Sequence, residues 1–220
     1  MPGLRIRAAE PRDLAFLVTG IRESERVPAD GRTMYEAIFA MTTAEVERFL
    51  GETLRTGPAD WGLSLERFLV AERAGTPVGA CAAWVEAAHG VPSGHLAAIA
   101  ISRFLGGTRW RASGTRVRAL ASSAPHRSAG ALQLESFYTA PEARGLGVSA
   151  RLIAQAIAHA VAGPTGPAIA EIGLLVENEA AARAYAKAGF APAWRTAAPN
   201  PAFREATGSV GFVQLRRALP

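Results

Sequence analysis

The chain has 220 residues, 49% of them hydrophobic, which is long enough to bury a sizeable core. No apolar run approaches the roughly 18 residues needed to span a bilayer, and the N-terminus lacks a signal-peptide pattern. The lone cysteine, Cys81, excludes a disulfide framework. We therefore expect a cytoplasmic protein without a membrane partner, in which Cys81 is a small core residue.

The net charge of +5 is carried almost entirely by arginine, since Lys187 is the one lysine among 24 basic residues. Between Glu86 and Glu135 there is no acidic residue but there are six arginines, at 103, 109, 111, 116, 118 and 127. Such a patch could attract a nucleotide phosphate or an acidic substrate. No aromatic ladder accompanies it, so we expect no nucleic-acid partner.

The N-terminal part predicts a strand at 4–8 and a helix starting near Leu14. Thr42 and Glu45 have the spacing of a capping box, which predicts a helix that Gly57 and Pro58 end. Residues 67–72 and 78–86 flank a turn sequence and are typical of a β-hairpin.

The second half predicts a short helix at 96–105, closed by Gly106 and Gly107, and a short helix or strand at 116–120. A strand at 131–139 and a helix with Leu152, Ile153 and Ile157 on one face follow. The remaining elements are a buried strand at 168–176, a helix at 179–188, and strands at 191–197 and 211–217 joined by a loop.

The segment from 132 to 160 is typical of a phosphate site. An apolar strand leads into Arg144-Gly145-Leu146-Gly147-Val148-Ser149, which opens into the apolar-periodic helix. Unpaired N–H groups at a helix start bind anions, and glycines let a ligand approach the backbone. Ser149 could cap this helix or donate its hydroxyl.

Two motifs carry a resemblance to a known family. The first, R-x-x-G-x-S from Arg144 to Ser149, is close to the R/Q-x-x-G-x-G/A signature of the GNAT superfamily of acyl-CoA-dependent N-acyltransferases. The second, residues 172–190, resembles the family's L-x-V-x-x-x-N-x-x-A-x-x-x-Y-x-K-x-G-F pattern, with Ile172 and Leu174 as apolar replacements. Ser149 stands where the family usually has Gly or Ala.

The resemblance implies an α/β fold of the α+β type. In this GNAT fold a mixed, mostly antiparallel sheet has helices on both faces, and the fourth and fifth strands splay apart to form a cofactor cleft. We expect one GNAT N-acetyltransferase domain over 1–220, with an insertion at about 88–130 between the third and fourth strands.

The same resemblance implies acetyl-CoA as co-substrate. In the family the loop at 144–149 holds the pyrophosphate, through Arg144, Gly145, Leu146, Gly147, Val148 and Ser149. Backbone groups of Phe137, Tyr138 and Thr139, at a bulge in the fourth strand, hold the thioester carbonyl and pantetheine. Asn178 resembles the residue that binds the pantetheine arm, although it could equally cap the following helix.

Tyr185 stands at the family's general-acid position, and a phenol stays protonated at neutral pH. The general base is less well marked. Glu135 is the first candidate, ahead of Glu171 and Glu86, because a carboxylate in an apolar strand can have a raised pKa. The histidines at 89, 95 and 126 lack metal-ligand spacing, so we expect no metal site.

These residues predict an N-acetyltransferase that moves an acetyl group to a primary amine of a small molecule or peptide by direct attack. The alternative is a non-catalytic acyl-CoA-binding or interaction module on the same scaffold. Acids at Glu23, Glu25 and Asp30 would suit a cationic acceptor, whereas the insertion with Trp84, Trp110 and Phe104 would suit a bulkier, more apolar one. The resemblance also allows a homodimer.

Overall fold

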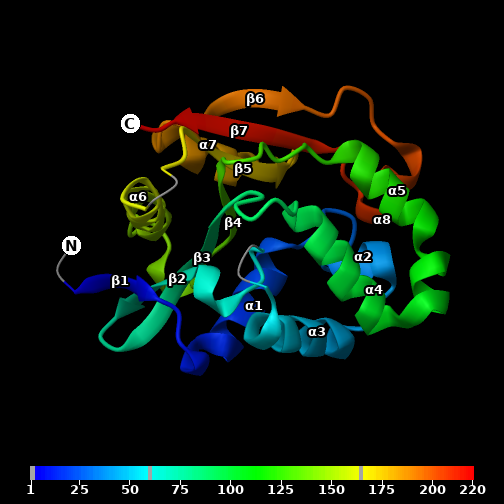
Figure 1. Ribbon diagram of the computed structural model, residues 1–220, viewed down its shortest axis with the longest axis horizontal. Coiled ribbons are helices and arrows are strands. Elements are labelled where there is room, and N and C mark those ends of the chain that lie inside the picture. The colour runs from blue at the N-terminus through cyan, green and yellow to red at the C-terminus, as the bar shows by residue number, and fades with distance from the viewer. Residues whose placement is uncertain (1–2, 59–60, 164–165) are drawn as a thin grey trace.

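One seven-stranded sheet, in the order β1-β2-β3-β4-β5-β7-β6, contains strands from both ends of the chain (Figure 1). The computed structural model describes residues 3–58, 61–163 and 166–220. Neighbouring strands are antiparallel, except that β4 and β5 are parallel. The strands are β1 (Leu4–Ala8), β2 (Phe68–Arg73), β3 (Thr76–Val85), β4 (Leu132–Thr139), β5 (Ile169–Leu175), β6 (Ala191–Arg195) and β7 (Phe212–Ala218).

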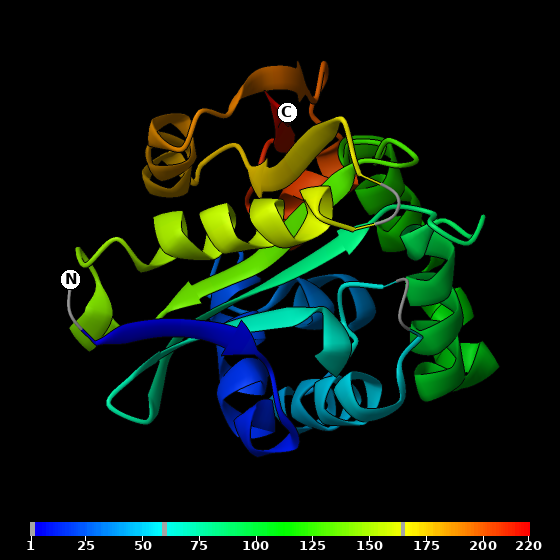
Figure 2. The ribbon, with the colours of Figure 1, turned by 60° about the vertical axis from the view of Figure 1, so that its left-hand side comes forward.

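Helices cover both faces of this sheet, as expected from the sequence. In Figure 2 α6 lies across one side of the central strands, while α1 and α3 lie on the other. The α-helices are α1 (Leu14–Ser24), α2 (Met34–Phe39), α3 (Thr43–Thr56), α4 (Ser93–Ala112), α5 (Gly114–Ser123), α6 (Val148–Val161), α7 (Glu179–Lys187) and α8 (Pro201–Thr207). Short 3₁₀ turns occupy Pro11–Asp13, Leu65–Arg67 and Pro141–Ala143.

The buried hydrophobic residues form three clusters around the sheet. The larger cluster packs α1, α2, α3, α4, α5 and α8 against one face, with Phe49, Phe68 and Phe203 almost fully buried. The second cluster lies where β4, β5 and β7 meet α6 and α7. Cys81 belongs to a third, between α6 and the β2–β3 hairpin, where burial raises the pKa of its thiol to about 12. Cys81 is therefore a core residue, as predicted.

Two helices that the sequence analysis did not predict carry clear end signals. Thr33 and Glu36 form a capping box at the start of α2, as Thr42 and Glu45 do for α3. Asn200 caps α8 with its side chain, and Gly208 ends it with φ at 74°.

One helix boundary expected from glycine also needs correction. Gly106 does break the helical geometry, with φ at 73°, but the chain resumes a helical path, so α4 continues to Ala112. The ambiguous segment at 116–120 lies inside helix α5.

Candidate active site

Strands β4 and β5 pair only briefly before they separate. Their parallel ladder consists of Leu132 with Ala170 and Gln133 with Glu171. Farther along β4 the register against β3 shifts, and Ser136 takes a left-handed conformation with φ at 52°. This bulge lies just before Tyr138, where the sequence analysis expected one, and a strained residue in a bulge is typical of a functional site. A cleft therefore opens beyond the bulge, between the two strands.

The loop before α6 presents free backbone donors. Gly145 and Gly147 have φ values of 77° and 69°, and a Cβ on either would meet no atom within 4 Å. Among the described residues, the N–H groups of Gly147, Val148 and Ser149 have no backbone acceptor. These donors lie at the positive end of a helix of 14 residues, an arrangement that can bind an anion.

Ser149 has a different position from the one expected. Gly147 occupies the N-cap, so Ser149 lies within the first turn of α6 rather than capping it. Its hydroxyl oxygen is 3.4 Å from Oγ1 of Thr139, the last residue of β4. This contact links the phosphate loop to the strand that borders the cleft.

Close packing fixes the start of α6 on the sheet. A Cβ on Gly79 of β3 would lie 2.5 Å from Cγ1 of Val148, so only glycine allows this approach. Across the sheet, a Cβ on Gly20 of α1 would lie 3.0 Å from the Cβ of Tyr138. The bulged strand β4 thus lies between α1 and α6, and the loop at 144–149 leads into α6.

Tyr185 of α7 lines a cavity that includes the cleft between β4 and β5. Its ring packs at 5.3 Å from the ring of Phe137 and 6.5 Å from that of Phe190. Burial, together with the nearby Cys81 thiol, raises the pKa of Tyr185 above its ordinary value. The phenol is therefore protonated at neutral pH and able to donate a proton into the cavity.

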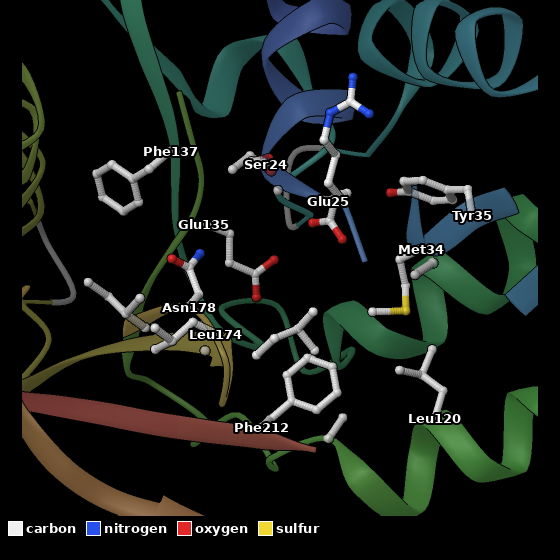
Figure 3. A pocket seen from close by; sticks show the side chains of 18 of the residues that line it. Ser24, Glu25, Met34, Tyr35, Leu120, Glu135, Phe137, Leu174, Asn178 and Phe212 are labelled. Carbon is white, nitrogen blue, oxygen red and sulfur yellow. The ribbon is translucent and has the colours of Figure 1, made fainter. Parts of the chain in front are cut away.

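Asn178 caps α7, because its Oδ1 accepts a hydrogen bond from the Ala181 N–H at 3.2 Å. It also lines the cavity, close to Leu174 (Figure 3). An amide that accepts through oxygen still has its Nδ2 donors available. Capping and ligand binding are therefore compatible at this residue.

A cavity of about 1030 Å³ joins the cleft to Arg144, Asn178 and Tyr185. Figure 3 shows Phe137, Leu174 and Asn178 on one side, Glu135 and Glu25 at the centre, and Met34 and Leu120 on the other. Its lining comes from the end of α1, from α2, α4 and α5, and from the separated strands β4 and β5. One cavity therefore reaches from the cleft to the segment between β3 and β4.

Glu135 lines this cavity and is ion-paired with Arg127. The Glu135 carboxylate accepts from Nε of Arg127 at 2.9 Å and from Nη2 of the same guanidinium. Arg127 in turn lies over the Trp84 ring, 5.4 Å from its centroid. The carboxylate predicted to act as base thus has an arginine partner.

The side chain of Glu25, by contrast, has no hydrogen-bond or ion-pair partner among the described residues. Glu25 follows the last residue of α1, where its carbonyl accepts a 2.8 Å hydrogen bond from the Met34 N–H and so fixes the turn into α2. Within the described chain neither carboxyl oxygen of Glu25 accepts a hydrogen bond. Burial, and secondarily the charge of Glu135, raises the pKa of Glu25 to about 7, although Arg127 opposes the shift.

Tyr35 lies beside this carboxyl. Figure 3 shows its hydroxyl directed towards Glu25. Burial and the charges of Glu25 and Glu135 raise the pKa of Tyr35 well above its ordinary value. The hydroxyl is therefore a protonated, neutral group at the centre of the cavity.

The other two carboxylates considered as bases are engaged in the structure. Glu86 accepts hydrogen bonds from the Ser93 N–H at 2.9 Å, from the Ser93 hydroxyl at 2.6 Å and from the Trp84 indole at 3.1 Å, which anchors the start of α4. Glu171 is fully buried and accepts from Gln133, Ser128 and Arg216. Both stabilise the fold around the cleft.

The residues expected to contact the acceptor are only partly brought together. Glu23 and Trp110 line the cavity, but Glu23 is paired with Arg26. Asp30 pairs with Arg32 on the surface. The ring of Trp84 is buried beneath Arg127, and Phe104 packs on Phe49 in the core.

Known proteins share this architecture. A model of the acetyltransferase (GNAT) family matches residues 33–190. An N-acetyltransferase from Staphylococcus aureus Mu50 superposes with a TM-score of 0.60 at 15% identity, over 97% of this chain and 100% of that one. YncA from Salmonella typhimurium, solved with its cofactor acetyl-CoA, gives 0.51 at 14% identity, over 99% and 95% of the two chains.

A polyamine N-acetyltransferase from Drosophila melanogaster gives a TM-score of 0.54 at 14% identity, over 98% of this chain and 100% of that one. At such identities these structures establish the shared fold. Among curated proteins no sequence matches the chain. The family model covers well over half of the chain, which therefore belongs to the GNAT acetyltransferase family and has its fold.

Within the described ranges, no helix is long and apolar enough to cross a membrane. No group of three or more His, Cys, Asp or Glu side chains there could hold a metal ion.

Proposed function

We propose that the protein transfers the acetyl group of acetyl-CoA to a primary amine by direct attack of the amine on the thioester. The observation that carries this proposal is the shared cavity. It connects the cleft between β4 and β5, and the Tyr185 phenol, to an unpaired carboxyl group on Glu25. A donor site and a proton acceptor in one cavity are what acyl transfer to an amine requires.

The donor fits the residues predicted for it. The free N–H groups of 147–149 suit the pyrophosphate, and Arg144 at the exposed mouth adds a positive charge. Between the separated strands, the backbone of residues 137–139 can bond pantetheine and polarise the thioester carbonyl. Asn178 can donate from Nδ2 to the same arm.

We assign the base to Glu25 and give Glu135, the base predicted from sequence, a positioning role. Arg127 donates twice to Oε1 of Glu135, whereas the Glu25 carboxyl has no hydrogen-bond donor in the described chain and a pKa raised to about 7, where a base is most effective. Glu135 contributes by raising the pKa of Glu25.

In this mechanism Glu25 removes a proton from the incoming ammonium, which leaves a neutral amine. The N–C bond forms as the C–S bond breaks, and Tyr185 protonates the departing sulfur. The proton that the nitrogen sheds on becoming an amide then restores the phenol, directly or through water. Glu25 finally returns its proton to solvent, so the reaction yields an amide, free CoA and one proton.

The test compares Glu25→Gln with the neighbouring Glu23→Gln in an assay that follows free CoA and identifies the N-acetyl product by mass. We expect Glu25→Gln to lower kcat on the order of 10²–10⁴-fold with acetyl-CoA affinity retained. Glu23→Gln should stay within a few-fold of the wild type. Acetyl-CoA binding without product from any amine would overturn the proposal and favour the binding-module alternative.

A further inference from the structure

The cavity continues past Glu25 into a space with uncharged walls, which we call the acceptor chamber. Its described lining from α2, α4 and α5 contains no charged side chain. It is made mainly by six residues, together with smaller neighbours: Met34, Phe39, Trp61, Ile101, Trp110 and Leu120. The rings of Phe39 and Trp110 stack on each other, with their centroids 6.2 Å apart and their planes at 12°.

The arginines of the same helices are directed elsewhere. Arg109 forms an ion pair with Glu45 of α3 at 2.6 Å, and Arg116 donates from Nε to the Ile38 carbonyl at 2.7 Å. None of the five arginines on α4 and α5 is among the residues that line the cavity. Helices α4 and α5 therefore line the chamber with apolar side chains, and their arginines lie away from it.

Charged side chains line other parts of the cavity. Glu25, Glu135 and Arg127 interact there, and the pairs formed by Glu135 with Arg127 and by Glu23 with Arg26 are each neutral as a unit. Glu177 also lines the cavity, but its carboxylate accepts hydrogen bonds from Ser209 and Val210, so ionised Glu25 is the carboxylate left to match one ammonium group. In the acceptor chamber a second charged group would lose its hydration without gaining a partner.

From this arrangement we infer that the acceptor is a primary monoamine on an apolar body. Its nitrogen lies between Glu25 and the thioester, and its hydrocarbon part fills the acceptor chamber. The inference rests on the proposed acetyl transfer and narrows its substrate class. At about 1030 Å³ the cavity slightly exceeds the range of about 300–1,000 Å³ usual for the pocket of a single small ligand.

The first arm of the test measures kcat/KM with acetyl-CoA for straight-chain amines from propylamine to octylamine. Burial of each methylene should raise kcat/KM about fourfold until the chamber is filled. The second arm compares n-heptylamine with hexamethylenediamine, which has the same length but ends in a second amine. We expect the monoamine to be favoured more than about a hundredfold.

Two matched variants test whether the dependence of kcat/KM on chain length arises in the acceptor chamber. Leu120→Gln makes the chamber wall polar and should flatten the dependence on chain length. Ile99→Gln makes the same kind of change at a 47% exposed position on α4 and should leave that dependence intact. Acetyl-CoA affinity, measured on both variants, reports that each is folded.

The outcomes separate the inference from the proposed function. Product from amines with no dependence on chain length, or with the diamine preferred, would overturn the apolar acceptor and leave acetyl transfer standing. An equal loss of that dependence in both variants would overturn the assignment to the chamber. Acetyl-CoA binding without product from any amine would overturn the transfer itself and the inference with it.

Discussion

The half-buried carboxyl of Glu25 makes stability depend on pH in a defined direction. Its pKa is about 7 in the folded protein, against an ordinary value of 4.5, so the folded state holds its proton longer. Stability is therefore lost as the pH rises from about 4.5 towards 7, and above 7 the full cost remains. We expect Glu25→Gln to unfold at higher urea than the wild type at pH 8, by on the order of 2 kcal/mol.

That difference should shrink as the pH falls below 5, where both states of the wild type bind the proton. Glu23→Gln is the control, since an exposed carboxylate paired with Arg26 should not produce the same gain. Equal stability of Glu25→Gln and the wild type at both pH values would contradict a raised pKa for the Glu25 carboxyl.

Tyr185 gives a second prediction at the scale of one residue. Tyr185→Phe keeps the ring that packs on Phe137 and Phe190 and removes only the hydroxyl. We expect kcat to fall on the order of 10²-fold while the Kd for acetyl-CoA changes little, because the proton is needed only as sulfur departs. Steady-state kinetics beside calorimetry measure both quantities, and an unchanged kcat would remove Tyr185 from the mechanism.

At the scale of elements, the junction of β4 and α6 carries the proposed donor site. Gly147→Asp places a carboxylate where the free N–H groups converge, so it should weaken acetyl-CoA binding at least tenfold in a calorimetric titration. Gly75→Asp is a matched control, because Gly75 also has a positive φ, 82°, and open surroundings but lies in the β2–β3 turn. Equal losses in the two variants would assign the effect to backbone strain rather than to repulsion at the loop.

Local signals determine which elements could be predicted from sequence. The capping box at Thr42 and the glycine loop before α6 act within a few residues, so they are visible in the chain itself. The same kind of signal marks α2 at Thr33 and α8 at Asn200, so both helices were predictable in principle. The full length of α4 was not predictable, because a glycine that breaks helical geometry does not show whether the helix resumes.

At the scale of the whole molecule, one side of the site could be predicted from sequence and the other could not. The donor side lies on β4, α6, β5 and α7, where two sequence motifs placed Tyr185, Asn178 and the loop. The acceptor side joins the end of α1 to α2, α4 and α5 across long sequence separations. The free carboxyl of Glu25 and the pairing of Glu135 with Arg127 depend on that assembly, so residue spacing could not distinguish the two acids.

Acetyl-CoA should stabilise the whole fold, because its site draws on the loop before α6 and on both separated strands. Binding to the folded state alone adds about 2.7 kcal/mol at a hundredfold excess over Kd. For a chain of 220 residues this corresponds to a rise in Tm of about 5–10 °C. Thermal denaturation with and without ligand measures it, and an unchanged Tm in saturating acetyl-CoA would contradict a donor site that spans these elements.

The dependence on pH of kcat/KM for the best amine, measured for the wild type and Glu25→Gln in saturating acetyl-CoA, is the sharpest test of Glu25 as the base. We predict that the wild-type kcat/KM rises through an inflection near pH 7, as the Glu25 carboxyl of the protein without bound amine loses its proton. Glu25→Gln should have a much lower kcat/KM without that inflection. The same inflection and a similar kcat/KM in both proteins would contradict Glu25 as the base.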